Sequence, residues 1–199
     1  FSIPWTPPLK QYIPLEAVVQ RIPNYSYQLF FSKPETTPVI EGKLDLFLRL
    51  LYDALKAENP IVQGDNLKDA LLGTNPTKPT DHRWPTDEDF AYYALQLKNM
   101  NGPLNYYRTT KFRFDEEIAA TLPSKLPDDL NVLLIWGSKD LTTPPERVEI
   151  MKSQVTQLEL QRLDGVGHWV MQEAKEEVTG KVLEWLGKIG LLPHASTKL

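Results

Sequence analysis

The chain has 199 residues, 41% of them hydrophobic and 24% charged, which is the composition of a folded globular protein and excludes a disordered or collagen-like chain. Its formal net charge is −4 and its basic residues form no cluster, so the sequence gives no electrostatic support for a nucleic-acid partner. No cysteine is present and no apolar run is long enough to cross a bilayer, which excludes disulfides, thiolate metal sites and a membrane span.

The start of the chain, residues 1–14, is typical of an extended connector. It contains Pro4, Pro7, Pro8 and Pro14, and proline lacks an amide donor and disfavours helix in the residue before it. It also lacks the charged start and the apolar stretch of a signal peptide, so we expect a cytoplasmic protein.

Helical spacing of apolar residues begins after this connector. It predicts a helix over residues 15–22, a dense aromatic segment over residues 25–31 and a strongly amphipathic helix over residues 44–55. Residues 57–85 are rich in proline and glycine, and they predict a loop with at most one short helix, over residues 66–72.

Three more helices are expected before residue 125. Thr86 and Asp89 have the spacing of a capping box, which predicts a helix over residues 87–98. The other two are expected over residues 103–110 and 115–120. The first part of the chain therefore consists of helices and loops.

The pattern changes at Asn131. Residues 132–136 are a continuous apolar run, Val-Leu-Leu-Ile-Trp, that ends at Gly137, and such a run is typical of a strand buried on both faces. Residues 158–163 alternate apolar and polar side chains and predict a second strand.

A helix is expected after each of these strands. Thr143 and Glu146 have capping-box spacing, with Pro144 at the favoured first position of the helix, and a last helix is expected over residues 173–189. Strand, helix, strand and helix predict a right-handed crossover unit of an α/β sheet. Two strands are too few for a complete sheet of this kind, so we expect the other strands in a segment outside this chain.

Each predicted strand leads into a loop with a titratable side chain. Asp140 follows the first strand and His168 follows the second, and α/β sheets place their active sites just beyond the carboxyl ends of strands. An acid that accepts a hydrogen bond from one imidazole nitrogen fixes the tautomer, so that the other nitrogen can take a proton. A buried structural histidine and an ordinary turn aspartate are the alternatives.

Asp140 and His168 belong to longer stretches that resemble sequences of a known protein family. Leu-Leu-Ile-Trp-Gly-Ser-Lys-Asp (133–140) and Gly-His-Trp (167–169) resemble the C-terminal part of α/β-hydrolases of the epoxide hydrolase and haloalkane dehalogenase group. Residues 23–31, Pro-Asn-Tyr-Ser-Tyr-Gln-Leu-Phe-Phe, and residues 102–108, Gly-Pro-Leu-Asn-Tyr-Tyr-Arg, resemble the two tyrosine-bearing segments of an epoxide hydrolase cap. The resemblance covers nearly the whole chain.

The resemblance implies roles for individual residues. Tyr27 and Tyr107 would direct their hydroxyls from the cap to the epoxide oxygen, and a phenol with an ordinary pKa of about 10 carries a proton to donate at neutral pH. His168 would activate the water that hydrolyses a covalent ester, with Asp140 orienting it. The alternative is that Tyr27 and Tyr107 are aromatic core residues of a helical cap and have no catalytic role.

The resemblance implies a small apolar epoxide as the substrate, and the Tyr-Gln pair of the family's cap lines its pocket. We assign Gln28, Phe30 and Trp169 either to the lining of that pocket or to packing. The chemistry needs no cofactor. The three histidines of the chain lack the spacing of metal ligands, so we expect no metal site.

The aspartate nucleophile of this family has no counterpart in the sequence. No G-x-D-x-G or G-x-S-x-G turn occurs, and Gly64-Asp65 follows no predicted strand. The expected fold is therefore an incomplete α/β-hydrolase: a helical cap over residues 1–127, then the last strands and helices of the core over residues 128–199. The nucleophile is expected in a missing N-terminal hydrolase segment, and this chain alone is expected to be inactive.

Two other functions stay open at this point. The helical part could be a non-catalytic module that binds an apolar ligand, or the intact protein could be a dehalogenase, although a halide site would favour tryptophan or asparagine donors. The unpaired edge of the first strand also predicts that the isolated chain forms a homodimer or an assembly with swapped elements.

Overall fold

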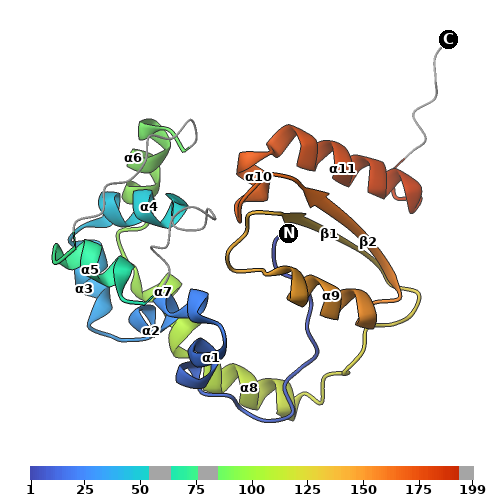
Figure 1. The fold of residues 1–199 in the computed structure, drawn as a ribbon, viewed down its shortest axis with the longest axis horizontal. Helices are drawn as coiled ribbons and strands as arrows, with labels where there is room; N and C mark the ends of the chain where they lie inside the picture. Colours follow the sequence, from blue (N-terminus) through green and yellow to red (C-terminus); the bar gives the residue numbers. More distant parts are fainter. Residues whose placement is uncertain (54–63, 76–84, 193–199) are drawn as a thin grey trace. The chain divides into compact units, whose positions relative to one another are not determined.

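The computed structural model describes residues 1–53, 64–75 and 85–192 (Figure 1). The chain folds into two compact units. One unit is Pro8–Pro123, and the other joins Phe1–Pro7 to Ser124–Leu199.

The unit Pro8–Pro123 is built from helices, and its described residues contain no strand. Its core is apolar and is made chiefly by Phe31, Ile40, Phe47, Leu71 and Phe90, each at most 2% exposed. The predicted helices are present, and they lie in the order α1 (Leu15–Arg21), η1 (Pro23–Tyr25), α2 (Tyr27–Phe31), α3 (Thr36–Glu41), α4 (Leu44–Asp53), α5 (Asn66–Leu72), α6 (Asp87–Gln96), α7 (Asn101–Arg108) and α8 (Thr110–Ala119).

Three features of this unit show where local sequence is and is not sufficient. The capping box of α6 is present, because Thr86 Oγ1 accepts the amide of Asp89 at 3.2 Å and the Asp89 carboxylate accepts the amide of Thr86 at 2.8 Å. Helix α3 was not predicted; Pro38 is its third residue, where an amide has no acceptor within the helix and proline costs little. Helix α8 begins at Thr110, earlier than predicted.

The other unit contains the two predicted strands. They are β1 (Asn131–Gly137) and β2 (Gln157–Leu163), which pair in parallel with Asn131 opposite Gln157 and Gly137 opposite Leu163. Among the described residues β1 and β2 form a two-stranded sheet. The parallel pairing confirms the predicted strand order, and it brings the carboxyl ends of both strands to one edge.

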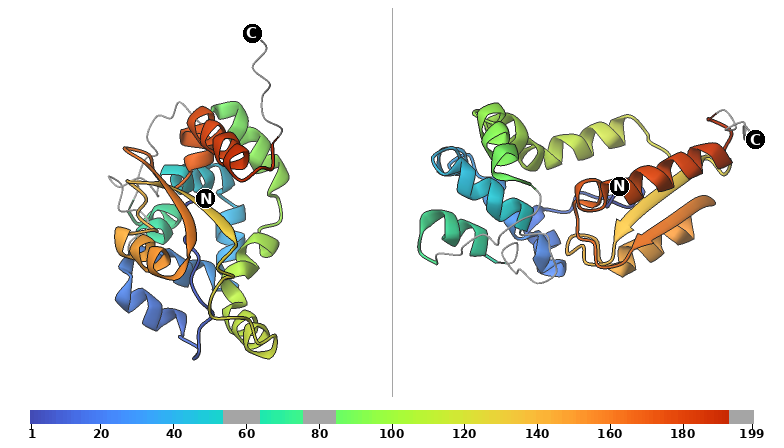
Figure 2. Two further views of the ribbon diagram at one scale, coloured as in Figure 1. Left: turned by 90° about the vertical axis from the view of Figure 1, so that its right-hand side faces the viewer. Right: turned by 90° about the horizontal axis from the view of Figure 1, so that it is seen from above.

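Helices cover both faces of this sheet, as Figures 1 and 2 show from three directions. Helix α9 (Pro145–Gln154) packs on one face, and α10 (Val170–Glu173) and α11 (Lys175–Lys188) pack on the other. Side chains of β1 point alternately to the two faces. Leu134 and Trp136 pack against Val148, Met151 and Val155, while Ile135 packs with Leu163, Val170 and Val178.

Two helix boundaries predicted in this unit are wrong. The capping box at Thr143 does not form: Pro144 is the N-cap of α9, and the Thr143 hydroxyl instead donates to the carbonyl of Ser2 at 2.6 Å. The last predicted helix is two helices, α10 and α11, divided at Ala174 with φ −133° and ψ 43°. Glu173 is the last residue of α10 and lies outside α11, and its carboxylate reaches back to the loop after β2.

The start of the chain does more than the expected connector. The amide of Ser2 donates to the carbonyl of Ile135 on β1 at 2.9 Å, and Trp5 packs against the cluster around Leu134. Ser2 has φ +60°, an uncommon value for a residue with a side chain. Its amide ties the first residues of the chain to β1, and its hydroxyl ties them to the loop that follows β2.

Gly137, the last residue of β1, lies against the loop that follows β2. A Cβ atom at this position would lie 2.1 Å from the carbonyl oxygen of Gly167 and 2.4 Å from that of Val166. Both neighbours are backbone atoms, so the clash cannot be relieved by turning a side chain. Glycine is required here because the two loops approach each other closely.

Replacing Gly137 by alanine should therefore destabilise this unit by at least about 2 kcal/mol, as overpacking does when the neighbours cannot yield. The measurement is urea unfolding followed by tryptophan fluorescence. The matched control is Gly180→Ala in α11, where nothing lies within 4 Å of the added Cβ and alanine should stabilise the helix by about 0.5–1 kcal/mol. Equal unfolding midpoints for Gly137→Ala and the unchanged chain would contradict this reading.

Candidate active site

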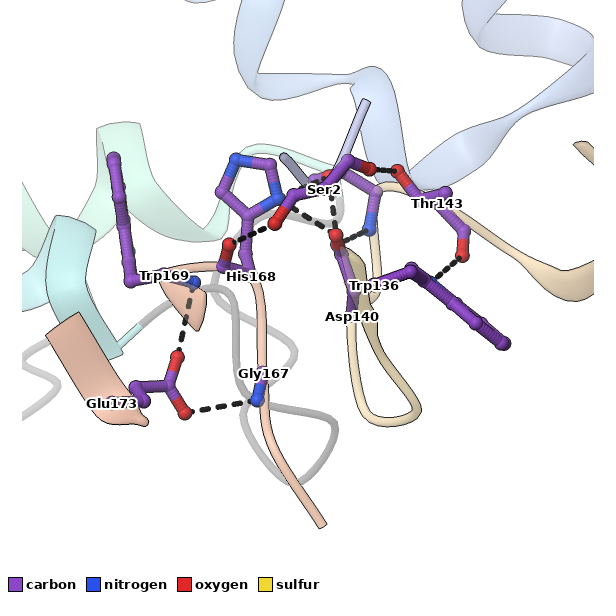
Figure 3. A network of polar contacts seen from close by, with 9 residues as sticks. Ser2, Trp136, Asp140, Thr143, Gly167, His168, Trp169 and Glu173 are labelled. Atoms are coloured by element: carbon purple, nitrogen blue, oxygen red, sulfur yellow. Dashed lines mark hydrogen bonds and ion pairs between the residues drawn. The ribbon is translucent and has the colours of Figure 1, made fainter. Parts of the chain in front are cut away.

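Asp140 and His168 meet at the edge of the sheet where β1 and β2 end. The Nδ1 atom of His168 lies 2.8 Å from Oδ2 of Asp140 (Figure 3). The Asp140 side chain is 0% exposed, whereas that of His168 is 17% exposed. The acid is therefore shielded behind the imidazole, and the imidazole keeps some contact with solvent.

Thr142 is a third member of this cluster. Its hydroxyl and its backbone amide both donate to Oδ1 of Asp140, each at 2.8 Å. The same hydroxyl oxygen lies 3.0 Å from Nδ1 of His168. The Asp140 carboxylate thus closes a turn with one oxygen and binds the imidazole with the other, so the turn role and the orienting role coexist.

These contacts assign the tautomer of His168. The Thr142 hydroxyl gives its proton to Asp140, so its oxygen faces the imidazole as an acceptor, and the second Asp140 oxygen is an acceptor too. Two acceptors around Nδ1 require that Nδ1 carry the proton. Nε2 of the neutral ring then has a free lone pair and can act as a base.

The backbone around His168 is fixed by side chains on both sides. The Glu173 carboxylate accepts the amides of Gly167 at 2.9 Å and Trp169 at 3.0 Å, and Ser2 Oγ donates to the carbonyl of His168 at 2.5 Å (Figure 3). The Trp169 ring stands edge-on to the imidazole, with ring centroids 5.1 Å apart. The loop enters through Gly165 at φ +78°, a conformation that favours glycine.

Tyr27 and Tyr107 lie together in the helical unit, on α2 and α7. Their ring centroids are 6.1 Å apart at an interplanar angle of 76°, and both rings pack against Phe31. Burial raises the pKa of the Tyr107 hydroxyl, as does the neighbouring Tyr106, and this outweighs a hydrogen bond from Tyr27 that acts in the opposite direction. Tyr107 therefore holds its proton firmly.

Arg108 links α7, the helix that carries Tyr107, to the segment after α2. Its guanidinium on α7 donates to the carbonyl of Lys33 at 3.1 Å and to the Thr37 hydroxyl at 2.7 Å. It also donates to Asn101 Oδ1 at 3.2 Å, and the Thr37 hydroxyl donates to the same oxygen at 3.1 Å. This network holds α7 against the segment that follows α2.

Two of the remaining candidate residues, Gln28 and Phe30, line different cavities, and the third, Trp169, belongs to the other unit. Gln28 donates to the hydroxyl of Tyr27 at 3.4 Å and lines a cavity of about 310 Å³ together with Tyr12, Tyr25 and Phe114. Phe30 lines a different cavity, of about 280 Å³. Trp169 lies beside His168 in the other unit.

No three histidine, aspartate or glutamate side chains gather as a metal-binding group in the ranges that the structure describes. In the same ranges no helix is both long and apolar enough to span a bilayer.

Comparison with known proteins shows what this arrangement is similar to. No protein-family model matches the chain. The rat protein named bifunctional epoxide hydrolase 2 is 27% identical over 206 aligned residues, which cover 100% of this chain and 36% of that protein. Over its whole length the chain is therefore similar in sequence to the C-terminal part of a protein named an epoxide hydrolase.

Solved structures of epoxide hydrolases share its fold. An epoxide hydrolase from an endophytic Streptomyces superposes with a TM-score of 0.71 at 23% identity and covers 94% of this chain and 59% of its own. Epoxide hydrolase VrEH1 from Vigna radiata gives 0.70 at 21%, covering 94% and 60%. These likenesses establish the fold, an α/β-hydrolase fold present here in part. The chain spans between about a third and three-fifths of the length of these epoxide hydrolases.

Sequence reasoning missed three residues that support the His168 loop. Thr142 could have been found, because a hydroxyl residue two positions after an aspartate is a common turn pattern. Glu173 and Ser2 carry no such signal. Glu173 lies inside what reads as a regular helix, and the contacts of Ser2 span more than a hundred residues of sequence.

The raised pKa of Tyr107 predicts how this residue titrates. The ultraviolet phenolate absorbance of the chain minus that of Tyr107→Phe should rise with a midpoint above about 10, the pKa of an unperturbed phenol. Because the folded chain holds this proton more tightly than the unfolded chain, Tyr107 should also contribute stability below about pH 10 that is lost as the pH rises through its raised pKa.

Tyr52→Phe provides a comparison for this titration. Burial and the neighbouring Tyr93 raise the pKa of Tyr52 to about 12, so its difference curve should lie higher still. A Tyr107 difference curve with a midpoint at or below 10 would be inconsistent with a buried, protonated donor.

Proposed function

We propose that this chain supplies the proton-transfer groups of an epoxide hydrolase, which converts an apolar epoxide and water to a vicinal diol. The observation that carries the proposal is the Asp140–His168 pair, with its buried acid, its assigned tautomer and its position at the carboxyl ends of parallel strands. The buried, protonated Tyr107 beside Tyr27 supports it, because epoxide opening needs an acid.

In the first step a carboxylate attacks an epoxide carbon, the carbon–oxygen bond of the ring breaks, and an ester forms. The epoxide oxygen leaves with the electron pair as an alkoxide. Hydroxyls of Tyr27 and Tyr107 would donate hydrogen bonds to this oxygen, and one would pass it a proton. The attacking carboxylate belongs to the nucleophile, which we expect in an N-terminal segment that this sequence does not contain.

In the second step water attacks the carbonyl carbon of the ester. Nε2 of His168 takes a proton from this water as the new carbon–oxygen bond forms, and the buried Asp140 stabilises the resulting imidazolium. Collapse of the tetrahedral intermediate breaks the ester bond, and His168 gives its proton to the departing alkoxide so that the diol is released. The carboxyl group then loses its proton and the tyrosinate regains one, which restores the starting state. Every step transfers only protons and electron pairs, so the proposal needs no cofactor.

The two compact units take different parts in this scheme. We assign the role of the cap to the helical unit and that of the C-terminal core to the unit with the sheet. The proposed boundary near residue 127 differs slightly from the one between the units, which changes at Ser124. Residues 1–7, which the proposal counts with the cap, pack with the sheet.

The proposal is tested by hydrolysis of a styrene-oxide-type substrate. We expect no turnover by the 199-residue chain alone and turnover by the full-length gene product that contains it. In that gene product Tyr107→Phe should lower kcat by about 100-fold, the usual loss for one donor to a developing oxyanion. Turnover by the chain alone, or a change in substrate affinity without a change in kcat, would contradict the proposal; the second result would favour a module that only binds an apolar ligand.

The same incompleteness predicts self-association. Beyond its bonds to β2, β1 receives two backbone bonds within the described part of the chain, from the amide of Ser2 to Ile135 and from the amide of Asp140 to Gly137 at the end of the strand, so most of one edge is available to another strand. We expect the isolated chain to form dimers or larger species, measured by light scattering after size-exclusion chromatography. A monodisperse monomer at high concentration would show that the edge is covered by other means.

A further inference from the structure

We propose that Glu173 is a positioning residue that holds His168 in place through the protein backbone. This inference deepens the proposed function and rests on it for its catalytic part. The bonds of Glu173 go to the backbone and not to the imidazole: its carboxylate accepts the amides of Gly167 and Trp169, the residues on either side of His168.

The Glu173 carboxylate and the two backbone amides that it binds form an arrangement that we call the clasp. Oε2 of Glu173 accepts the amide of Gly167 at 2.9 Å, and Oε1 accepts the amide of Trp169 at 3.0 Å, so one carboxylate binds the residue before and the residue after His168. The clasp is closed from the helical side as well, because the amide of Glu173 donates to the carbonyl of Trp169 at 2.8 Å. Hydrogen bonds to an ionised acceptor are about twice as strong as neutral ones.

The glycine before the histidine fits this carboxylate. A Cβ atom on Gly167 would lie 2.9 Å from Oε1 and 3.1 Å from Oε2 of Glu173, closer than real Cβ contacts. Gly167 does not have a positive φ, so its backbone conformation does not require glycine. The space is taken by the carboxylate itself, as its bond to the Gly167 amide requires.

The position of the imidazole follows from these constraints. Glu173 and Ser2 together fix the peptide group that follows His168, through the Trp169 amide and the His168 carbonyl, and Glu173 also fixes the peptide group between Val166 and Gly167. The ring then turns only about its side-chain bonds, and the 2.8 Å contact with Asp140 selects its orientation. Without the clasp the loop can shift, and a shift of an ångström is sufficient to misplace a general base.

Glu173→Gln is the direct test, because it keeps the size of the side chain and changes one acceptor into a donor. That donor would face a backbone N–H, so one of the two bonds is lost. In the 199-residue chain we expect the amides of Gly167 and Trp169 to exchange with solvent about tenfold faster. The Nδ1–H proton resonance of His168 should broaden, while the rest of the spectrum stays that of the folded chain.

Glu176→Gln is the matched control. Glu176 lies in the first turn of α11 and pairs with Lys175 on the surface, away from the loop. It should leave both amides and the His168 resonance unchanged. If Glu173 only stabilised α11 through its negative charge, Glu173→Gln and Glu176→Gln would change amide exchange and the His168 resonance to the same extent.

Gly167→Ala is a second variant, which displaces the same carboxylate from the opposite side. It should reproduce faster exchange at the Trp169 amide even if Glu173→Gln fails to fold. Combined with Glu173→Gln it should add little, because either change alone opens the clasp. Full additivity of the two effects on exchange would contradict the proposal.

In the full-length gene product, Glu173→Gln should affect formation of the ester and hydrolysis of the ester differently. His168 acts only in hydrolysis of the ester, so Glu173→Gln should leave the rate of ester formation unchanged, lower kcat by about tenfold and let the ester accumulate. Exchange, resonance and ester hydrolysis that all match the unchanged protein would overturn the proposal. If the gene product opens no epoxide, the proposed function fails, and the exchange measurements still decide the role of Glu173.

Discussion

The site depends on one interaction, the hydrogen bond between the buried carboxylate of Asp140 and Nδ1 of His168. The two residues come from different strands, and they meet only because β1 and β2 pair in parallel with Gly137 opposite Leu163. A shift of register by one residue would move one partner along the sheet and reverse the faces of its strand. The apolar packing of Leu134 on one face and Ile135 on the other therefore fixes the distance between acid and base.

A shell of weaker contacts turns this bond into a defined geometry. Thr142 donates to Oδ1 of Asp140, the oxygen that does not face the imidazole. Gly137 lets the loops after β1 and β2 approach each other, and Ser2 and Glu173 bind the backbone around His168. The tyrosines are held in the other unit by the same kind of arrangement, with aromatic packing on Phe31 and the Arg108 network between helices. The candidate residues are thus held by partners that are close in sequence, such as Thr142, and by partners far away in it, such as Ser2.

That distance explains what the sequence could and could not predict. The strand over residues 132–136, the capping box of Thr86 and the candidates Asp140 and His168 are encoded by neighbouring residues, and local reasoning found them. The capping box at Thr143 failed because its hydroxyl is used by Ser2, a partner from the start of the chain. The break at Ala174 was missed for the same reason, since the carboxylate before it serves a loop and not a helix. Gln28 and Phe30, neighbours in sequence, line different cavities because α2 turns them to different sides.

The account requires that the neutral imidazole of His168 carry its proton on Nδ1 and present Nε2 as the base. Long-range proton–nitrogen correlation spectra of the uniformly ¹⁵N-labelled chain, at a pH where the ring is neutral, distinguish the two tautomers directly. We expect the Nδ1–H form for His168, and its loss in Asp140→Asn, where an amide can donate to Nδ1. An Nε2–H tautomer in the unchanged chain would contradict the account, because the nitrogen available to water would then have no lone pair to accept a proton.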